Sequence, residues 1–134
     1  MTNTDDFGKL ILRVTLAILI LFHGIGKIMG GPGFVMEAVS NMGLPAALGY
    51  FVYVGEVIAP ALLLVGLWSR AAAGIIAVNM VVAILLVHKS QLASLSNTGG
   101  WALELQGMYL FSAAALVMLG AGRYSLGGSS GKWN

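Results

Sequence analysis

The chain contains a long apolar run at residues 10–29, "LILRVTLAILILFHGIGKIM". An α-helix rises about 1.5 Å per residue, so a run of about 20 residues crosses the roughly 30 Å hydrocarbon core of a bilayer. The lead that precedes it, "MTNTDD", is acidic, whereas the start of a secretory signal peptide is basic, and no A-x-A cleavage pattern follows the run. We therefore expect a mature membrane-spanning helix and not a cleaved signal.

Three further apolar runs of similar length follow, at residues 48–67, 71–88 and 102–121. Hydrophobic residues make up 58% of the 134-residue chain and charged residues 9%, a composition far from that of soluble domains. The sequence predicts an all-α integral membrane protein, a four-helix bundle that forms a single domain over residues 1–134.

Charge and cysteine content exclude several classes of function. The formal net charge is +2, and no run of basic residues is present, so nucleic acid is not an expected partner. The chain has no cysteine, which excludes disulfides and thiolate metal sites within it. The expected surroundings are the lipid bilayer.

The distribution of basic residues predicts the orientation. Four spans place both termini and the turn after the second span on one side, which holds Lys9, Arg13, Arg70, Arg123 and Lys132. The opposite side holds only Lys27 and Lys89. Because Lys and Arg are retained on the cytoplasmic side, both termini are predicted to be cytoplasmic.

The first outer loop, residues 30–47, is predicted to contain a short helix. It opens with Gly and Pro and closes with Gly43 and Pro45, which are helix start and stop signals. Its apolar residues recur on one helical face: Phe34, Val35, Ala38, Val39 and Met42. We expect this helix to lie in the outer membrane interface.

Polar side chains occur on all four spans, and counting from the span ends places them in the outer half of the membrane. These residues are His23, Lys27, Glu56, Asn79, His88, Glu104 and Gln106. Polar groups within a span usually face the protein interior or a cavity. The sequence therefore predicts a polar pocket in the outer half.

His23 and Lys27 are four residues apart and share one helical face. Glu56 is the deepest acid, and an unpaired carboxylate at its depth would tend to take up a proton. We expect His23, at a similar depth, to be its partner. Pro60 lacks the N–H that would bond the carbonyl of Glu56, so the second helix is predicted to be broken there. The alternative role for the pair is structural, fixing helix contacts only.

Several short motifs resemble those of the DoxX family of small bacterial membrane proteins. They are "HGIGKIMGG" at 23–31, "MGLP" at 42–45, "GE" at 55–56, "LLLVGLWSR" at 62–70 and "GAGRYSLG" at 120–127. The likeness extends over residues 10–126. It departs from the family at Ala121, where relatives often have proline. Relatives vary at the position of His23, so the resemblance favours Lys27 and Glu56 as site residues.

The resemblance implies a four-helix protein of the bacterial inner membrane. Relatives are linked to thiosulfate:quinone oxidoreductase subunits, to resistance against quinones and catechols, and to a membrane complex with a sulfurtransferase and a superoxide dismutase. A partner oxidoreductase or sulfurtransferase is therefore expected.

The leading functional hypothesis is a redox-associated protein whose outer pocket binds a quinone or a similar small aromatic in quinone or catechol detoxification. Glu56 and His23 are the candidates for proton transfer, since carboxylates and imidazoles suit that task. The candidate ligand contacts are Lys27, Asn79, His88, Glu104 and Gln106. Electrons have to come from a bound partner or cofactor, because the chain lacks flavin and dinucleotide motifs.

Two other functions are compatible with the sequence: a non-enzymatic membrane subunit or anchor for a partner complex, and a small-solute transporter. Homo-oligomers are compatible with all three. Metal and haem sites are less favoured, because neither membrane glutamate has a histidine three residues on and His23 and His88 differ in depth by roughly 9 Å. A Cu(I) site of Met29, Met36 and Met42 is weighed against ordinary apolar packing.

Overall fold

The structure is a computed structural model that describes residues 2–134. Helix α1, Asn3–Gly30, begins within the acidic lead, well before the apolar run. A capping box explains the early start: the backbone N–H of Asp5 donates to the Thr2 hydroxyl, and the Thr2 N–H donates to the Asp5 carboxylate, both over 3.2 Å. The first helix is therefore about two turns longer than residues 10–29 predicted.

The second span is continuous over Ala46–Val65 but changes its helical geometry twice. It consists of the 3₁₀ helix η1, Ala46–Phe51, the π-helical turn η2, Val54–Ile58, and the α-helix α3, Ala59–Val65. Pro60 at the start of α3 supplies no N–H for the usual i→i−4 bond. The predicted break in this helix is present and takes the form of a π turn.

A tight turn joins this span to α4, Ser69–Val87, and both Gly66 (φ 80°) and Trp68 (φ 48°) adopt left-handed backbone conformations there. The short helix η3, Lys89–Gln91, and a long loop lead to α5, Glu104–Leu119. The predicted helix in the first connection is α2, Gly33–Asn41.

Within residues 2–134, three spans are long and apolar enough to cross a membrane: Asn3–Gly30, Ala46–Val65 and Ser69–Val87. Helix α5 is apolar but has 16 residues, shorter than the predicted 102–121. Residues Trp101–Leu103 form a turn before it, and Gly120 (φ 78°) ends it. Residues 2–134 thus contain five α-helices, a more elaborate arrangement than a plain bundle of four.

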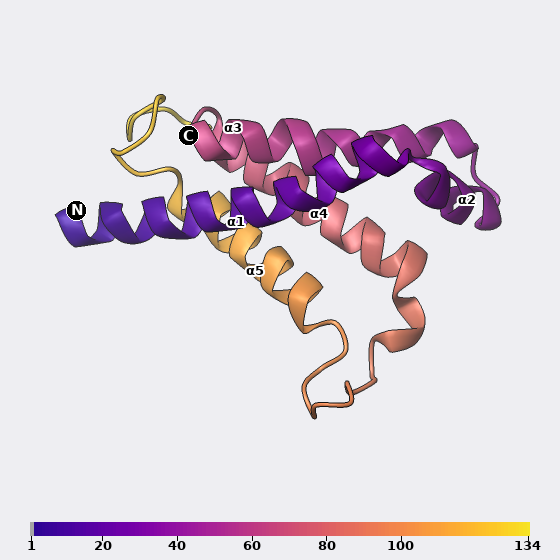
Figure 1. Cartoon of the computed structure of the whole chain (residues 1–134). Coiled ribbons are helices and arrows are strands. Elements are labelled where there is room, and N and C mark those ends of the chain that lie inside the picture. The colour runs from indigo at the N-terminus through magenta and orange to yellow at the C-terminus, as the bar shows by residue number, and fades with distance from the viewer. Residues whose placement is uncertain (1) are drawn as a thin grey trace.

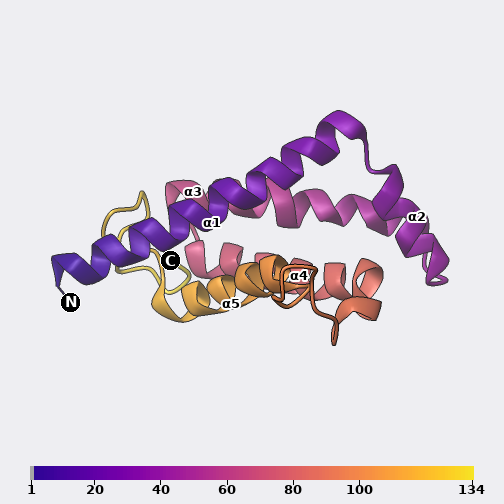
Figure 2. The same ribbon diagram turned by 60° about the horizontal axis from the view of Figure 1, so that its bottom comes forward.

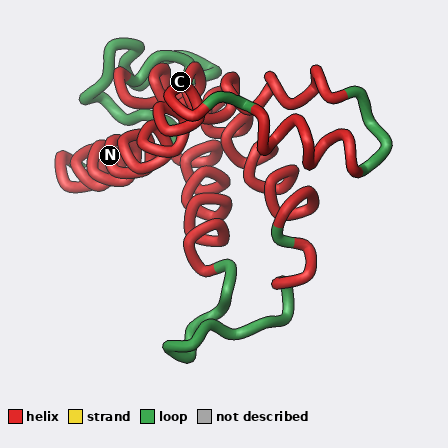
Figure 3. Tube along the Cα trace, turned by 45° about the vertical axis from the view of Figure 1, so that its right-hand side comes forward, coloured by secondary structure: helices red, strands yellow, loops and turns green. Residues whose placement is uncertain are grey.

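The helices form two layers, one of α1 with the Ala46–Val65 span and one of α4 with α5 (Figures 1 and 2). Small and aliphatic side chains join the layers: Leu16, Ala17, Ile20, Ala59, Leu63, Ala72, Ala73, Ile76, Met80, Tyr109, Ala113 and Leu116. Figure 3 shows the long loop between α4 and α5 projecting away from this core. Both termini lie at one end, here called the terminal end, and α2 and the α4–α5 loop lie toward the other, the loop end.

Two arginine side chains, one of them buried, hold the terminal end together. The Arg13 guanidinium, 1% exposed, donates to the carbonyls of Leu63 and Leu64 over 2.6 Å and to that of Tyr124 over 2.7 Å. Arg70 likewise donates to two carbonyls in the last turn of α5. The last carbonyls of a helix lack intrahelical partners, so arginine donors there satisfy groups that would otherwise be orphaned.

Candidate functional site

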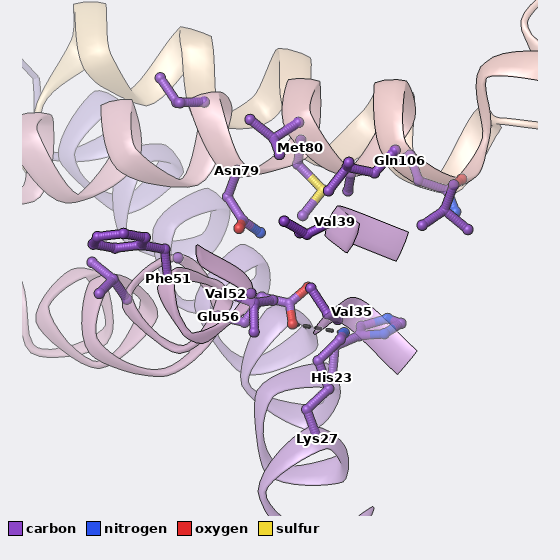
Figure 4. Close-up of a pocket in the computed structure, with 18 of the residues that line it drawn as sticks. His23, Lys27, Val35, Val39, Phe51, Val52, Glu56, Asn79, Met80 and Gln106 are labelled. Carbon is purple, nitrogen blue, oxygen red and sulfur yellow. Dashed lines mark ion pairs between the residues drawn. The ribbon is translucent and has the colours of Figure 1, made fainter. Parts of the chain in front are cut away.

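A cavity of about 550 Å³ lies between the two layers. Its walls come from α1, α2, the first half of the Ala46–Val65 span, α4 and α5, and most of them are aliphatic or aromatic. Figure 4 shows polar side chains from α1, η2, α4 and α5 directed into this space. A mainly apolar cavity with a few convergent polar groups is typical of small-molecule sites.

An ion pair between Lys27 and Glu56 forms the polar centre of the cavity. The Lys27 Nζ lies 2.7 Å from the Glu56 Oε2, and the Glu56 side chain is 7% exposed (Figure 4). A buried carboxylate needs a partner, because removing its charge from water costs several kcal/mol. The ammonium supplies that partner and leaves Lys27 itself partly exposed.

The prediction that His23 pairs with Glu56 is wrong, because Lys27 takes that position. Lys27 lies one helical turn beyond His23, and its four-carbon stem is long enough to reach back by about 5 Å. The His23 ring instead packs edge-on against Tyr109, with the ring centroids 5.9 Å apart. His23 is exposed yet still lines the cavity.

The π turn positions Glu56 for the ion pair. In this turn the N–H of Ala59 donates to the carbonyl of Val54, five residues earlier. The extra residue per turn changes the direction of the side chains that precede it, and π turns occur frequently at functional sites. Next to the turn, the Tyr53 hydroxyl donates to the Lys27 carbonyl over 3.0 Å and joins α1 to this span.

Two glycines allow the neighbouring helices to approach the π turn closely. A Cβ at Gly24 would overlap the backbone carbonyl of Glu56, and a Cβ at Gly55 would overlap the side chain of Asn79. Only glycine permits such close contact between helix backbones. The polar centre is thus held between α1 and α4.

Asn79 lies on α4, across the cavity from Glu56 (Figure 4). Its Nδ2 is buried and makes no hydrogen bond within residues 2–134. Leaving a buried donor unsatisfied costs about 1–3 kcal/mol. The wall of the cavity therefore contains a buried amide donor that no acceptor in the described part of the chain satisfies.

A second polar group lines the cavity nearer the loop end. The Gln106 Nε2 lies 3.4 Å from the His88 Nε2, and the His88 Nδ1 lies 2.9 Å from the Gln91 Oε1. His88 and Gln106 are both half-buried and both line the cavity. The structure thus brings together residues from the third and fourth predicted spans, as expected.

Glu104 is the one predicted site residue outside this cavity. It is exposed at the first position of α5, and its carboxylate lies against Gly100 in the preceding loop. Because α5 begins later than residue 102, Glu104 projects toward that loop and not between the layers. A role for Glu104 in binding a ligand has no support from this geometry.

The sequence did not single out two tyrosines near the polar centre: Tyr109, which lines the cavity, and Tyr53, which bonds the Lys27 carbonyl without lining it. Tyr109 is 7% exposed and lines the cavity three residues after Gln106, on the same face of α5. This spacing was the available signal for Tyr109. Tyr53 had the weaker signal of lying beside the predicted helix break.

The described residues, 2–134, contain no cluster of three or more histidine and acidic side chains able to hold a metal ion. The methionines considered for Cu(I) have separate environments. Met29 and Met42 are 84% and 53% exposed, and Met36 packs over Gly49.

The profile of the DoxX family matches residues 8–89, more than half of the chain. The chain belongs to the DoxX family. The matched segment includes Lys27, Glu56, Asn79 and His88, whereas the motif at residues 120–127 lies beyond it.

A curated relative from Bacillus subtilis (strain 168), named "Putative oxidoreductase CatD", is 30% identical to this DoxX protein over 87 residues. The match covers 65% of this chain and 64% of the relative, slightly less than two thirds of that protein's length. No solved structure matches the chain.

Proposed function

We propose that this DoxX protein binds a quinone or a similar small aromatic molecule at the Lys27–Glu56 pair. The observation that carries the proposal is a buried ion pair within a largely apolar cavity, opposite an unpartnered amide donor on Asn79. Burying such groups is costly unless each finds a partner, and a ligand bearing oxygen atoms would supply one.

A quinone matches this arrangement group by group. Its flat ring suits the apolar walls, and its carbonyl oxygens accept hydrogen bonds from the Lys27 ammonium and the Asn79 amide. After reduction, the hydroxyl of the quinol donates to the Glu56 carboxylate. The same side chains thus bind both redox forms.

Reduction of a quinone to the quinol takes two electrons and two protons. The proposed electron source is a partner oxidoreductase at the bacterial inner membrane, in quinone or catechol detoxification. In this proposal Glu56 delivers protons to the reduced quinone, and His23, which is exposed, replenishes them from solvent. The Bacillus subtilis relative is named "Putative oxidoreductase CatD", which is in keeping with this role.

The proposal predicts that Glu56→Gln weakens quinone binding at least tenfold, because the amide no longer holds the Lys27 ammonium in position to donate to a quinone carbonyl. The measurement is titration of a short-chain benzoquinone into protein in lipid nanodiscs. The matched control is Glu37→Gln, since Glu37 is an exposed glutamate of α2 that lies outside the cavity. Unchanged affinity in folded Glu56→Gln protein would contradict the proposal.

A second candidate function is a non-enzymatic membrane subunit in which the pair only fixes helix packing. The close contacts of Gly24 and Gly55 around Glu56 favour it. The exchange variant Lys27→Glu/Glu56→Lys separates the two functions, because it restores an ion pair with its direction reversed. A structural role predicts recovery of thermal stability and of all function, whereas ligand binding predicts that quinone affinity stays low.

A further inference from the structure

One wall of the cavity reaches the outer surface of the molecule along α4. Ile75, Val78 and Val82 all line the cavity, and they lie three and four residues apart, on one helical face. They are also 41%, 63% and 45% exposed. Side chains that both line the cavity and reach the surface mark an opening between the two.

The facing rim comes from the start of the second span. Leu48 and Phe51 line the same cavity and are 41% and 66% exposed. Phe51 and Asn79 lie on opposite sides of the space in Figure 4. This opening, here called the α4 portal, is therefore apolar on both rims.

The depth of the α4 portal places it against lipid. Val78 lies nine residues before Val87, the last residue of α4, which corresponds to about 13 Å along the helix axis. Ile75 lies deeper by a further turn. Because α4 is long and apolar enough to span the membrane, the α4 rim faces hydrocarbon at this depth. Leu48 and Phe51 lie two and five residues into the Ala46–Val65 span, nearer its outer end.

The polar side chains of the cavity do not lie on the rims of the α4 portal. Glu56 and Asn79 project into the cavity behind the α4 portal, and the polar lining nearer the loop end comes from His88 and Gln106. A molecule that enters from the bilayer would therefore meet an apolar passage first and polar partners second.

We infer that the ligand of this site is a membrane-dissolved amphiphile, whose oxygen-bearing ring lies at the Lys27–Glu56 pair and whose long apolar tail leaves through the α4 portal into the lipid. This inference rests on the proposed function and specifies its ligand as a tail-bearing quinone. The tail remains in apolar surroundings throughout, so its length adds no transfer cost. A sealed cavity of about 550 Å³ would instead exclude long tails.

The test compares a tail-less benzoquinone with the same ring carrying an isoprenoid tail of eight units, in nanodiscs, with affinities expressed as mole fractions in the lipid. The wild type is expected to bind the two quinones with affinities that differ by no more than about threefold. Val78→Trp, which narrows the portal, is expected to lower the ratio of tailed to tail-less affinity at least tenfold. The matched control is Val81→Trp, because Val81 is 43% exposed on the same helix but does not line the cavity; its ratio should equal that of the wild type.

The other outcomes overturn the inference in distinguishable ways. If the wild type binds the tail-less quinone and rejects the tailed one, the α4 portal is wrong and the proposed function stands. If neither quinone binds to the folded wild type, both are wrong. If native mass spectrometry shows a second copy of the chain that Val78→Trp removes and Val81→Trp does not, the α4 face is a subunit interface and the portal is again wrong.

Discussion

At the scale of single residues, Gly24 determines how closely α1 approaches the π turn. A side chain at this position would meet the backbone carbonyl of Glu56 and the side chain of Val57. Gly26, two residues further along α1, has open space around it. Two glycines in one motif thus have different roles, and only the first is required for packing at the site.

We predict opposite effects of alanine at these two positions. Gly24→Ala should lower stability by about 1–3 kcal/mol, because the added methyl group forces α1 away from a backbone atom, and it should weaken quinone binding by moving Lys27. Gly26→Ala should be neutral or stabilising by up to about 1 kcal/mol, since alanine favours a helix over glycine. Thermal unfolding in detergent measures both, and equal losses in the two variants would contradict this role of Gly24.

Lys27 and Glu56 were both predictable as candidate site residues, since placing a charged side chain within a membrane span costs free energy. Their contact was not predictable, because the depth of a residue along a helix does not give the reach of a flexible side chain that extends back by one turn. The Lys27 stem decides this contact.

At the scale of elements, the second span is the part of the fold on which the site depends. It combines 3₁₀, π and α geometry within Ala46–Val65. The π turn lies directly before Pro60, where the missing N–H and the bulk of the ring disfavour a regular α-helix. A break at this point was predictable, whereas its π form and the direction it gives Glu56 were not.

We predict that Pro60→Ala separates stability from binding. Alanine supplies an N–H that can bond the carbonyl of Glu56, so regular α geometry becomes available, and loss of the extra residue turns the preceding side chains by about 100°. Quinone affinity should fall about tenfold while thermal stability stays within about 1 kcal/mol of the wild type. Pro45→Ala, at the start of η1, is the control and should retain affinity. Equal binding by Pro60→Ala and the wild type would show that the π turn does not depend on the proline.

At the scale of the whole molecule, the two ends differ. The terminal end is closed by the segment after α5, where Arg123 pairs with Asp6 over 3.2 Å and the N–H groups of Leu126 and Gly127 bond the carbonyls of Val65 and Gly66. The loop end contains the cavity and its polar groups. The cavity's polar groups and the hydrogen-bonded closure after α5 thus lie at opposite ends of the molecule.

The orientation predicted from the basic residues is open to a direct test, because the natural chain has no cysteine. Single cysteines at the exposed positions Asn97, in the α4–α5 loop, and Ser130, near the C-terminus, report on the two ends. An impermeant maleimide should label Asn97→Cys in intact spheroplasts and should label Ser130→Cys only after permeabilisation. The reverse pattern would place both termini outside.

The amino-acid sequence by itself determined the membrane class, three of the four predicted spans, the short helix α2 and the break before Pro60, because each follows from local composition, periodicity or a missing donor. The DoxX motifs indicated the family. The sequence also indicated most of the polar residues that line the cavity, since burying a polar side chain within a membrane span costs free energy at any depth.

Tertiary structure decided which of those residues meet. The Lys27–Glu56 contact, the packing of His23 on Tyr109, the exclusion of Glu104 and the apolar α4 portal all depend on how two helical layers pack and on where the helices end. These are contacts between segments far apart in the chain, and helical periodicity gives the face of each residue without giving the neighbour across from it. The close approach of α1 at Gly24 and the direction that the π turn gives Glu56 determine the contacts at the site, which helical periodicity does not give.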